Sequence, residues 1–353
     1  MEGELPSVTR QIARMNDGRW ALVMGNGYDS ALQRPVLLIQ YLDGHKELIK
    51  LVAGSTSGDG NGLSPPRLVD FNGDNVPDVA YAGDLHGNMW KFDLSDRSPS
   101  RWHVAFDGAP LFTATDGATP ASAQPITSAP VWAAHPDGGL MLAFGTGRHL
   151  TKADRADTSR QSVYGIYDNT QITRPPGSGS VSMTEKRPVS GRGELVEQAM
   201  IASPTQPVGT VSSTPVPYSG AGARRGWFID LPFAGQRILR NLNWFDGDLI
   251  DVESTVPAKG GDTEVDTCVP PTASGKGYRT TIDILQGNPP KSRIYASLPS
   301  LASGPVATIE VGLNAPLSSG KQQIAVPPTG MPPPPARDYL GRFVKRAAWR
   351  QMQ

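Results

Sequence analysis

The sequence predicts an all-β protein built from several antiparallel sheets that are arranged radially. A short apolar segment ending in glycine recurs along the chain, and each copy is followed by a second strand-like segment that ends near an aspartate. With 39 glycines and 33 prolines in 353 residues, their combined share exceeds the ordinary value of about 12%, so turns are frequent. The repeats contain no long amphipathic helical pattern, which favours all-β over α/β.

The repeat is clearest when "DGRWALVMGNGY" (17–28) is compared with "DGGLMLAFGTGR" (137–148), because Asp, Leu and three Gly recur at an offset of 120. Halfway between them, "PDVAYAGDLHG" places another glycine after a short apolar segment. The glycines that mark the three copies are 58 and 62 residues apart: Gly25, Gly83 and Gly145. A period near 60 is longer than a typical propeller blade, but it fits a blade that carries loop insertions.

The second segment of each copy is short and rich in aromatic and β-branched residues, which favours strands. These segments are "LLIQYLDG" (37–44), "NMWKFDL" (88–94), "VYGIYDN" (163–169) and "GWFIDLP" (226–232). Glycine at each strand end is expected to let the backbone turn with a positive φ at low cost.

Other stretches interrupt the repeat and define the expected organisation. It comprises propeller blades over 1–325, with loop insertions at about 170–225 and 255–278, a Pro-rich spacer at 326–338 and a basic tail at 339–353. Within the first insertion we expect one short helix, at Glu194–Ile201. The spacer, "VPPTGMPPPPARD", is expected to be extended and semi-rigid. The tail fits one face of a helix and a closing strand equally well.

Composition excludes several classes of protein. Lys and Arg together number 33, as do Asp and Glu, so no net field steers the chain to nucleic acid or an anionic membrane. No apolar run approaches the ~20 residues of a membrane span. Met1 is followed by Glu-Gly-Glu, so we expect no signal peptide in this chain. The single cysteine, Cys268, cannot form an intrachain disulfide or a cysteine-based zinc site.

The segment "DFNGDNVPD" (70–78) carries oxygen ligands at alternate positions. Ca²⁺ takes six to eight oxygens, and a loop supplies them best from alternate positions. The predicted calcium ligands, in the order of an EF-hand loop through its ninth position, are Asp70, Asn72, Asp74, the carbonyl of Val76, and Asp78. Three carboxylates would repel one another without a cation, so the metal is expected to help to fold the loop.

The loop departs from an EF-hand at two positions. Asn75 takes the place of the usual glycine, although asparagine tolerates a left-handed conformation, and Tyr81 takes the place of the bidentate glutamate. Mg²⁺ fits less well because it demands tighter octahedral geometry. The alternative is an acidic turn, since Asp and Asn favour turns, but this does not explain the strict alternation.

The sequence resembles a known family over nearly its whole length. "RWALVMGNGYDS", "GNGLSPPRLVDFNGDNVPDVAYAGDLHGNMWKFDLS" and "PLFTATD…QPITSAPVWAAHPDGGLMLAFGTGRHL" resemble the C-terminal domain of the PilY-type adhesins of the type IV pilus tip. The resemblance is strong over 17–170 and weaker after 230, where "GWFIDLP" and the final "KRAAWRQ" follow in the same order.

This resemblance implies a modified β-propeller whose calcium loop regulates pilus extension and retraction. The family's ligands fall on Asp70, Asn72, Asp74, Val76 and Asp78. It also implies a location at the cell envelope, at the outer pilus tip reached through the periplasm, with minor pilins as partners and roles in twitching motility and adhesion, including to host surfaces.

Two departures from the family matter. Family members have an upstream part with a signal peptide, an adhesive region and the first blades. We therefore expect a partial propeller that self-associates, or pairs with an upstream adhesin region or a partner chain. Family members also often have paired cysteines near Cys268, and only one is present here.

Two other classes compete with this interpretation. A quinoprotein dehydrogenase is also a calcium propeller, but it usually needs a vicinal cysteine pair, which one cysteine excludes. The five histidines lack metal-binding spacing, and no GxSxG or P-loop motif is present, so we predict that the chain is not an enzyme. The other alternative is a structural propeller scaffold, in which calcium only stabilises the fold, as a staple would. A calcium titration of pilus retraction distinguishes this scaffold from a regulatory role of calcium.

Overall fold

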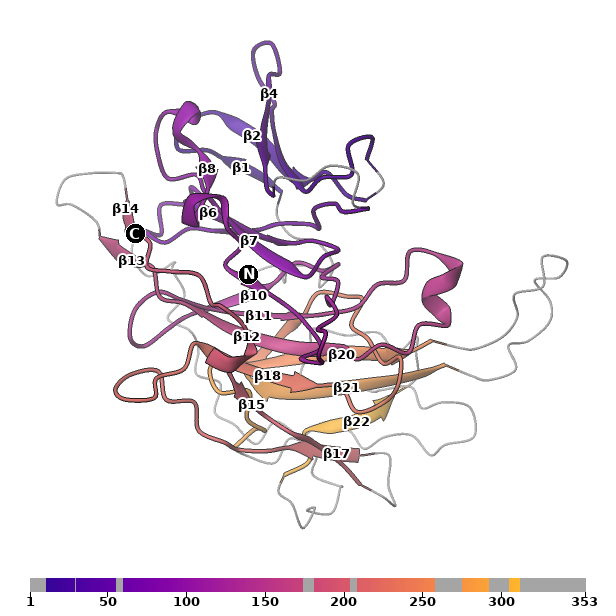
Figure 1. Cartoon of the computed structure of the whole chain (residues 1–353). Coiled ribbons are helices and arrows are strands. Elements are labelled where there is room, and N and C mark those ends of the chain that lie inside the picture. The colour runs from indigo at the N-terminus through magenta and orange to yellow at the C-terminus, as the bar shows by residue number, and fades with distance from the viewer. Residues whose placement is uncertain are drawn as a thin grey trace, which may run out of the picture.

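The computed structural model describes residues 11–28, 30–54, 60–173, 181–203, 208–257, 275–291 and 305–311. The expected spacer at 326–338, the basic tail at 339–353 and Cys268 lie outside these residues. The described strands form four sheets of four to six strands and one two-stranded hairpin. Figure 1 shows the sheets following one another in chain order, from the indigo first sheet to the orange and yellow last sheet.

The first two sheets are local in sequence. The first sheet has the order β1 (Ile12–Arg14), β2 (Trp20–Gly25), β3 (Val36–Tyr41) and β4 (Leu48–Val52). The second has the order β5 (Arg67–Val69), β6 (Val79–Gly83), β7 (Asn88–Asp93) and β8 (His103–Val104), with β9 (Phe112–Thr113) also paired to β7. All these pairings are antiparallel.

The last two sheets draw on distant segments. The third has the order β10 (Val131–Ala134), β11 (Leu140–Gly145), β12 (Ser162–Asp168), β18 (Gly226–Asp230) and β15 (Val196–Glu197). The fourth has the order β16 (Met200–Ala202), β17 (Val208–Val211), β22 (Thr308–Val311), β21 (Lys276–Asp283), β20 (Leu249–Val256) and β19 (Asn243–Asp246). The hairpin pairs β13 (Gln171–Thr173) with β14 (Ser182–Thr184).

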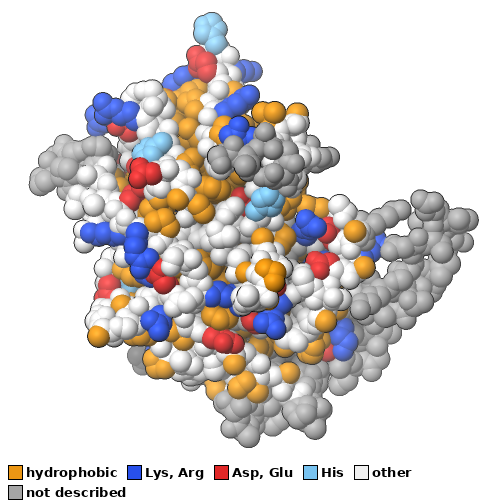
Figure 2. All heavy atoms as spheres, in the orientation of Figure 1, with side chains coloured by type: hydrophobic (Ala, Val, Ile, Leu, Met, Phe, Trp, Pro, Cys, Tyr) orange, Lys and Arg blue, Asp and Glu red, His pale blue; other side chains and the backbone are white. Residues whose placement is uncertain are grey.

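Helical structure in the described residues is limited to short 3-10 turns. These are η1 (Pro99–Arg101), η2 (Phe106–Gly108), η3 (Lys152–Arg155) and η4 (Arg192–Glu194). None of the described helices has the length and hydropathy to cross a bilayer. Figure 2 shows basic and acidic side chains interspersed on the face drawn, as the zero net charge suggests.

Each pair of successive sheets encloses a hydrophobic core. Val23 and Ile39 of the first sheet pack with Trp90 and Phe92 of the second. The next core joins the second and third sheets, and the last joins the third and fourth. Sheets that face one another in series are the arrangement of propeller blades, so the predicted all-β class is confirmed.

The repeated glycines end the second strand of each of the first three sheets, but not for the expected reason. Gly25, Gly83 and Gly145 are absent from the positions with positive φ. A Cβ at Gly83 would overlap Ile126, and one at Gly145 would overlap Ile238. Glycine is needed here because another segment passes against the strand end.

Two further expectations are wrong. The segment 226–232 contains the expected strand, β18, but this strand is not the second strand of a further copy, because it pairs with β12 in the third sheet. The helix at Glu194–Ile201 is replaced by the end of η4 and the strands β15 and β16. β15 pairs in parallel with β18, and this tertiary pairing outweighs local helix propensity. Residues 170–225 thus supply strands to two sheets as well as the hairpin.

Candidate metal centre

The candidate loop, residues 70–78, joins β5 to β6 at the edge of the second sheet. Its base is closed by the backbone of Asp78, whose N–H donates to the carbonyl of Val69 at 2.8 Å. The Asp78 carbonyl accepts from the N–H of Leu94 at 2.9 Å. The sheet therefore fixes both ends of the loop, while the residues between them are half-buried or exposed up to Val76.

The oxygen-bearing side chains fold back onto the loop's own backbone. Asp70 accepts three bonds, from the N–H groups of Asn72 (3.0 Å) and Gly73 (2.6 Å) to Oδ1 and from Asn75 (2.7 Å) to Oδ2. Asn72 Oδ1 accepts from the N–H of Asp74 at 2.8 Å. Asp74 Oδ1 accepts from the N–H of Val76 at 2.9 Å. The predicted alternation thus turns successive polar side chains toward the same backbone.

Two residues of the loop adopt left-handed backbone conformations. Gly73 has φ of 78° and Asn75 has φ of 66°. Asn75 occupies the position that is glycine in an EF-hand, and the sequence had indicated that asparagine tolerates such a conformation there. The tight turn that a calcium loop requires at its sixth position is therefore present.

Asp78 is the most unusual side chain of the loop, because it is fully buried. Its Oδ2 accepts from the N–H of Phe71 at 2.9 Å, but its Oδ1 is buried without a hydrogen-bond partner. Burial, followed by the nearby charges of Asp70 and Asp74, raises the pKa of Asp78 to about 6. A buried carboxylate oxygen with no donor is costly unless a cation satisfies it.

Sequence reasoning missed Asn16, which anchors the loop from the first sheet. Its Nδ2 donates to the carbonyl of Pro77 at 3.0 Å and to that of Leu94 at 2.9 Å. Asn16 lies between β1 and β2, 61 residues before Pro77. No local pattern signals such a contact, because it exists only once the first two sheets are packed together.

The predicted ligands lie in one loop, but they are not gathered into a preformed acidic cluster. Within the described ranges, no group of three or more His, Cys, Asp or Glu side chains is placed to hold a metal ion. The donor chemistry still fits a hard cation, since three carboxylates, one amide and one carbonyl follow in order and one buried oxygen is unsatisfied.

A second acidic residue of the recognised sequence motif has a structural role. Asp84 is fully buried, and its Oδ2 accepts from Trp90 Nε1 (2.8 Å), Asn61 Nδ2 (3.0 Å) and Asn88 Nδ2 (2.9 Å). Its Oδ1 accepts from the N–H groups of His86 and Asn88, both at 2.9 Å. Five hydrogen-bond donors thus surround the Asp84 carboxylate, and its role in "AGDLHGNMW" is to hold the turn between β6 and β7.

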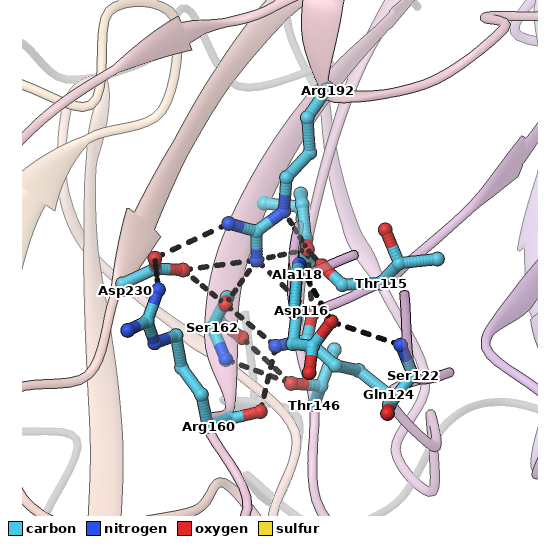
Figure 3. A network of polar contacts seen from close by, with 11 residues as sticks. Thr115, Asp116, Ala118, Ser122, Gln124, Thr146, Arg160, Ser162, Arg192 and Asp230 are labelled. Carbon is cyan, nitrogen blue, oxygen red and sulfur yellow. Dashed lines mark hydrogen bonds and ion pairs between the residues drawn. The ribbon is translucent and has the colours of Figure 1, made fainter. Parts of the chain in front are cut away.

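Sequence reasoning also missed a polar network around Arg192 of η4 (Figure 3). Its guanidinium donates to the hydroxyl of Tyr164 from Nε (2.9 Å) and Nη2 (2.7 Å), and Nη2 lies 2.9 Å from Asp230 Oδ1. It also lies over the ring of Phe228, 4.4 Å from the centroid. The network holds η4 against β12 and β18.

Four mainly antiparallel sheets that face one another in series, with an oxygen-rich loop at the edge of the second, define a protein of the β-propeller type. Residues 5–205 match the family model of the PilY1 beta-propeller domain, and the chain belongs to that family. The resemblance noted in the sequence is thereby confirmed, and the matched region contains the whole loop.

The comparisons extend to characterised relatives. The chain is similar to the type IV pilus biogenesis factor PilY1 of Pseudomonas aeruginosa strain PAO1, with 38% identity over 253 residues, which is 64% of this chain and 21% of that protein. A PilY1 homolog of Xylella fastidiosa is 34% identical over 242 residues, covering 64% of this chain and 15% of that protein. The chain thus spans about a fifth or less of the length of these relatives.

A solved structure supports the fold. The crystal structure of the Pseudomonas aeruginosa PilY1 C-terminal domain matches with a TM-score of 0.67 and 27% identity. The match covers 89% of this chain and 67% of that one. The predicted PilY-type propeller fold is therefore confirmed.

Proposed function

We propose that this chain is the calcium-responsive propeller of a type IV pilus biogenesis factor, and that it controls pilus extension and retraction without catalysing a reaction. Relatives at 38% and 34% identity are named as such biogenesis factors. Under this proposal the chain acts at the cell envelope, at the pilus tip, with minor pilins as partners, and supports twitching motility and surface adhesion.

The observation that carries the calcium assignment is the unpartnered Oδ1 of fully buried Asp78. The proposed ligands are oxygens of Asp70, Asn72, Asp74 and Asp78, with the carbonyl of Val76. Bound Ca²⁺ supplies positive charge that offsets the three carboxylates. It also satisfies an oxygen that the protein leaves without a donor.

The anchoring of the loop suggests how a partner distinguishes the calcium-bound loop from the calcium-free loop. Asp78 and Leu94 tie the loop to the second sheet, and Asn16 ties it to the first. A filled loop presents a fixed surface with little net charge, whereas an empty one presents a mobile anionic surface. A partner that contacts this edge binds the two states with different affinity, which is the requirement for a switch.

The second candidate, a structural scaffold, is favoured by the same anchoring, because a cation there would also fasten two sheets together. Under that function calcium raises stability, but pilus behaviour does not follow calcium once the protein is folded. The two candidates therefore differ in cells and not in a binding assay.

The cellular test introduces Asp78→Ala into the chromosomal gene, with Asp96→Ala as the control. Asp96 belongs to the same region, pairs with Arg101 and lies outside the loop. The proposal expects Asp78→Ala to change surface piliation and twitching at normal protein levels, while Asp96→Ala does not.

Asp78→Lys provides the opposing variant, because its ammonium replaces part of the cation's charge. It is expected to restore piliation and shift the phenotype in the opposite direction. Asp74→Ala also removes a proposed calcium ligand, but at an exposed position, where the substitution affects folding less. Wild-type piliation and twitching in variants that have lost calcium binding would reject regulation and favour the scaffold.

A further inference from the structure

A cavity opens on the fourth sheet, away from the calcium loop. It has a volume of about 320 Å³ and lies between this sheet and the segment that follows β18. Its walls include Met200, Val208, Pro232, Phe233, Val256 and Tyr278. No part of the proposed pilus function uses this cavity.

The cavity contains an aromatic platform. The ring of Phe233 stacks on that of Tyr278, with centroids 4.9 Å apart and planes inclined by 23°. Tyr278 is buried, and burial raises its pKa to about 12, whereas Phe233 is 41% exposed. An exposed phenylalanine held flat by a stacked partner offers an apolar face to a ligand.

An ion pair borders the same cavity. Lys276 Nζ lies 3.6 Å from Glu310 Oε2, and both residues line the walls. Glu310 is opposite Tyr278 in the β21–β22 register, so the charges lie beside the aromatic platform. The cavity therefore combines an apolar surface with one group of each charge.

We propose that this cavity binds the chain's own Pro-rich segment, residues 326–338, in an extended polyproline conformation. Aromatic-lined grooves recognise such segments because the polyproline helix is preformed and loses little entropy on binding. Arg337 and Asp338 follow the four consecutive prolines, and they match the charges of Glu310 and Lys276.

The connection is long enough for this contact. The last described strand, β22, ends at Val311, one residue after Glu310 of the cavity wall. Val326 follows Val311 by 15 positions, which span up to about 50 Å when extended. A tether of this kind holds the segment at a local concentration in the millimolar range, so a weak contact suffices.

The test uses a fluorescein-labelled synthetic peptide of residues 326–338 and measures its anisotropy with the full chain. A second full chain carries serine at each of Pro332, Pro333, Pro334 and Pro335, so that its own segment no longer competes. The proposal expects the peptide to bind the serine-substituted chain about tenfold more tightly than the unmodified chain. Phe233→Ala in the substituted chain abolishes binding, whereas Trp20→Ala, at an exposed aromatic of the first sheet, leaves it unchanged.

Equal affinity for the two chains, binding to neither, or binding that survives Phe233→Ala would overturn the proposal. Sedimentation of the unmodified chain tests the alternative that the segment of a second copy occupies the cavity. Self-association that disappears on serine substitution would assign the segment to the cavity of a second copy and would reject the intramolecular contact.

Discussion

The ammonium of Lys91 lies 3.0 Å from Oδ2 of Asp168, and both side chains are buried between the second and third sheets. Lys91 also donates to Thr170 Oγ1 at 2.6 Å, and the hydroxyl of Tyr81 donates to Asp168 Oδ2 at 2.6 Å. Although burial pushes the pKa of Asp168 upward, Lys91 and these hydroxyl groups hold it below its ordinary value. The pair thus joins two successive blades through a satisfied charged contact.

Removing one partner of this pair should destabilise the fold strongly. Lys91→Met leaves the Asp168 carboxylate buried without its counter-charge, and a loss of about 3–5 kcal/mol in the free energy of unfolding is expected. Lys91→Met combined with Asp168→Leu should lose less than Lys91→Met alone. Urea denaturation measures both; a double variant that is less stable than the single one would contradict this account of the pair.

Gly83 should not tolerate a side chain. Its Cβ would overlap Ile126, so Gly83→Ala is expected to cost about 1–3 kcal/mol through overpacking. Gly193→Ala is the matched control, because nothing lies within 4 Å of a Cβ built there. Thermal melting of the two variants should separate them, and equal melting temperatures would show that the close approach at Gly83 is unimportant.

Asn75 tests the geometry of the loop independently of its charges. Asn75→Gly keeps access to φ of 66° and should retain calcium affinity, whereas Asn75→Val places a β-branched residue in that conformation and should weaken it. Calorimetric titration of both variants measures the difference. Equal affinities would mean that the left-handed turn does not determine the binding conformation.

Asp78 should make stability depend on pH in the calcium-free chain. Its pKa of about 6, against an ordinary 3.8, means that the folded state favours the protonated form, so its contribution is present at low pH and is lost as pH rises through about 4 to 6. Relative to Asp78→Asn, the wild type should gain up to about 3 kcal/mol between pH 7 and pH 4. Urea denaturation across this range measures the gain.

Saturating calcium should reverse this dependence, because the cation stabilises the ionised carboxylate and protons compete with it. The calcium-dependent rise in unfolding free energy is therefore expected to shrink as pH falls below 6. A pH profile that is identical for wild type and Asp78→Asn, in calcium-free buffer, would contradict the raised pKa.

The elements that were predictable from sequence depend on local patterns. The alternation at 70–78 identified the loop, and the spacing of Gly25, Gly83 and Gly145 located the second strand of the first three sheets. The long-range contacts were not predictable. Asn16 reaches the loop from another sheet, and β18 joins β12 across 57 intervening residues, since β12 ends at Asp168 and β18 begins at Gly226.

The error at Glu194–Ile201 has the same origin. A helix was expected there, but the chain is extended because β15 pairs with β18 and β16 with β17. The reason for the repeated glycines also depended on contacts between distant segments, because Ile126 packs against the strand end at Gly83 and Ile238 packs against the strand end at Gly145. Tertiary contacts of this kind override the local helix or strand propensity of the residues involved.

We propose that the loop binds calcium through the buried carboxylate of Asp78. Isothermal titration of the full chain with Ca²⁺ tests it most directly, in parallel with Asp78→Ala and the control Asp96→Ala. We expect one Ca²⁺ per wild-type and per Asp96→Ala chain, weaker binding of Mg²⁺, and no binding to this site in Asp78→Ala. An Asp78→Ala chain that binds Ca²⁺ with unchanged affinity, or a wild-type chain that binds none, would contradict it.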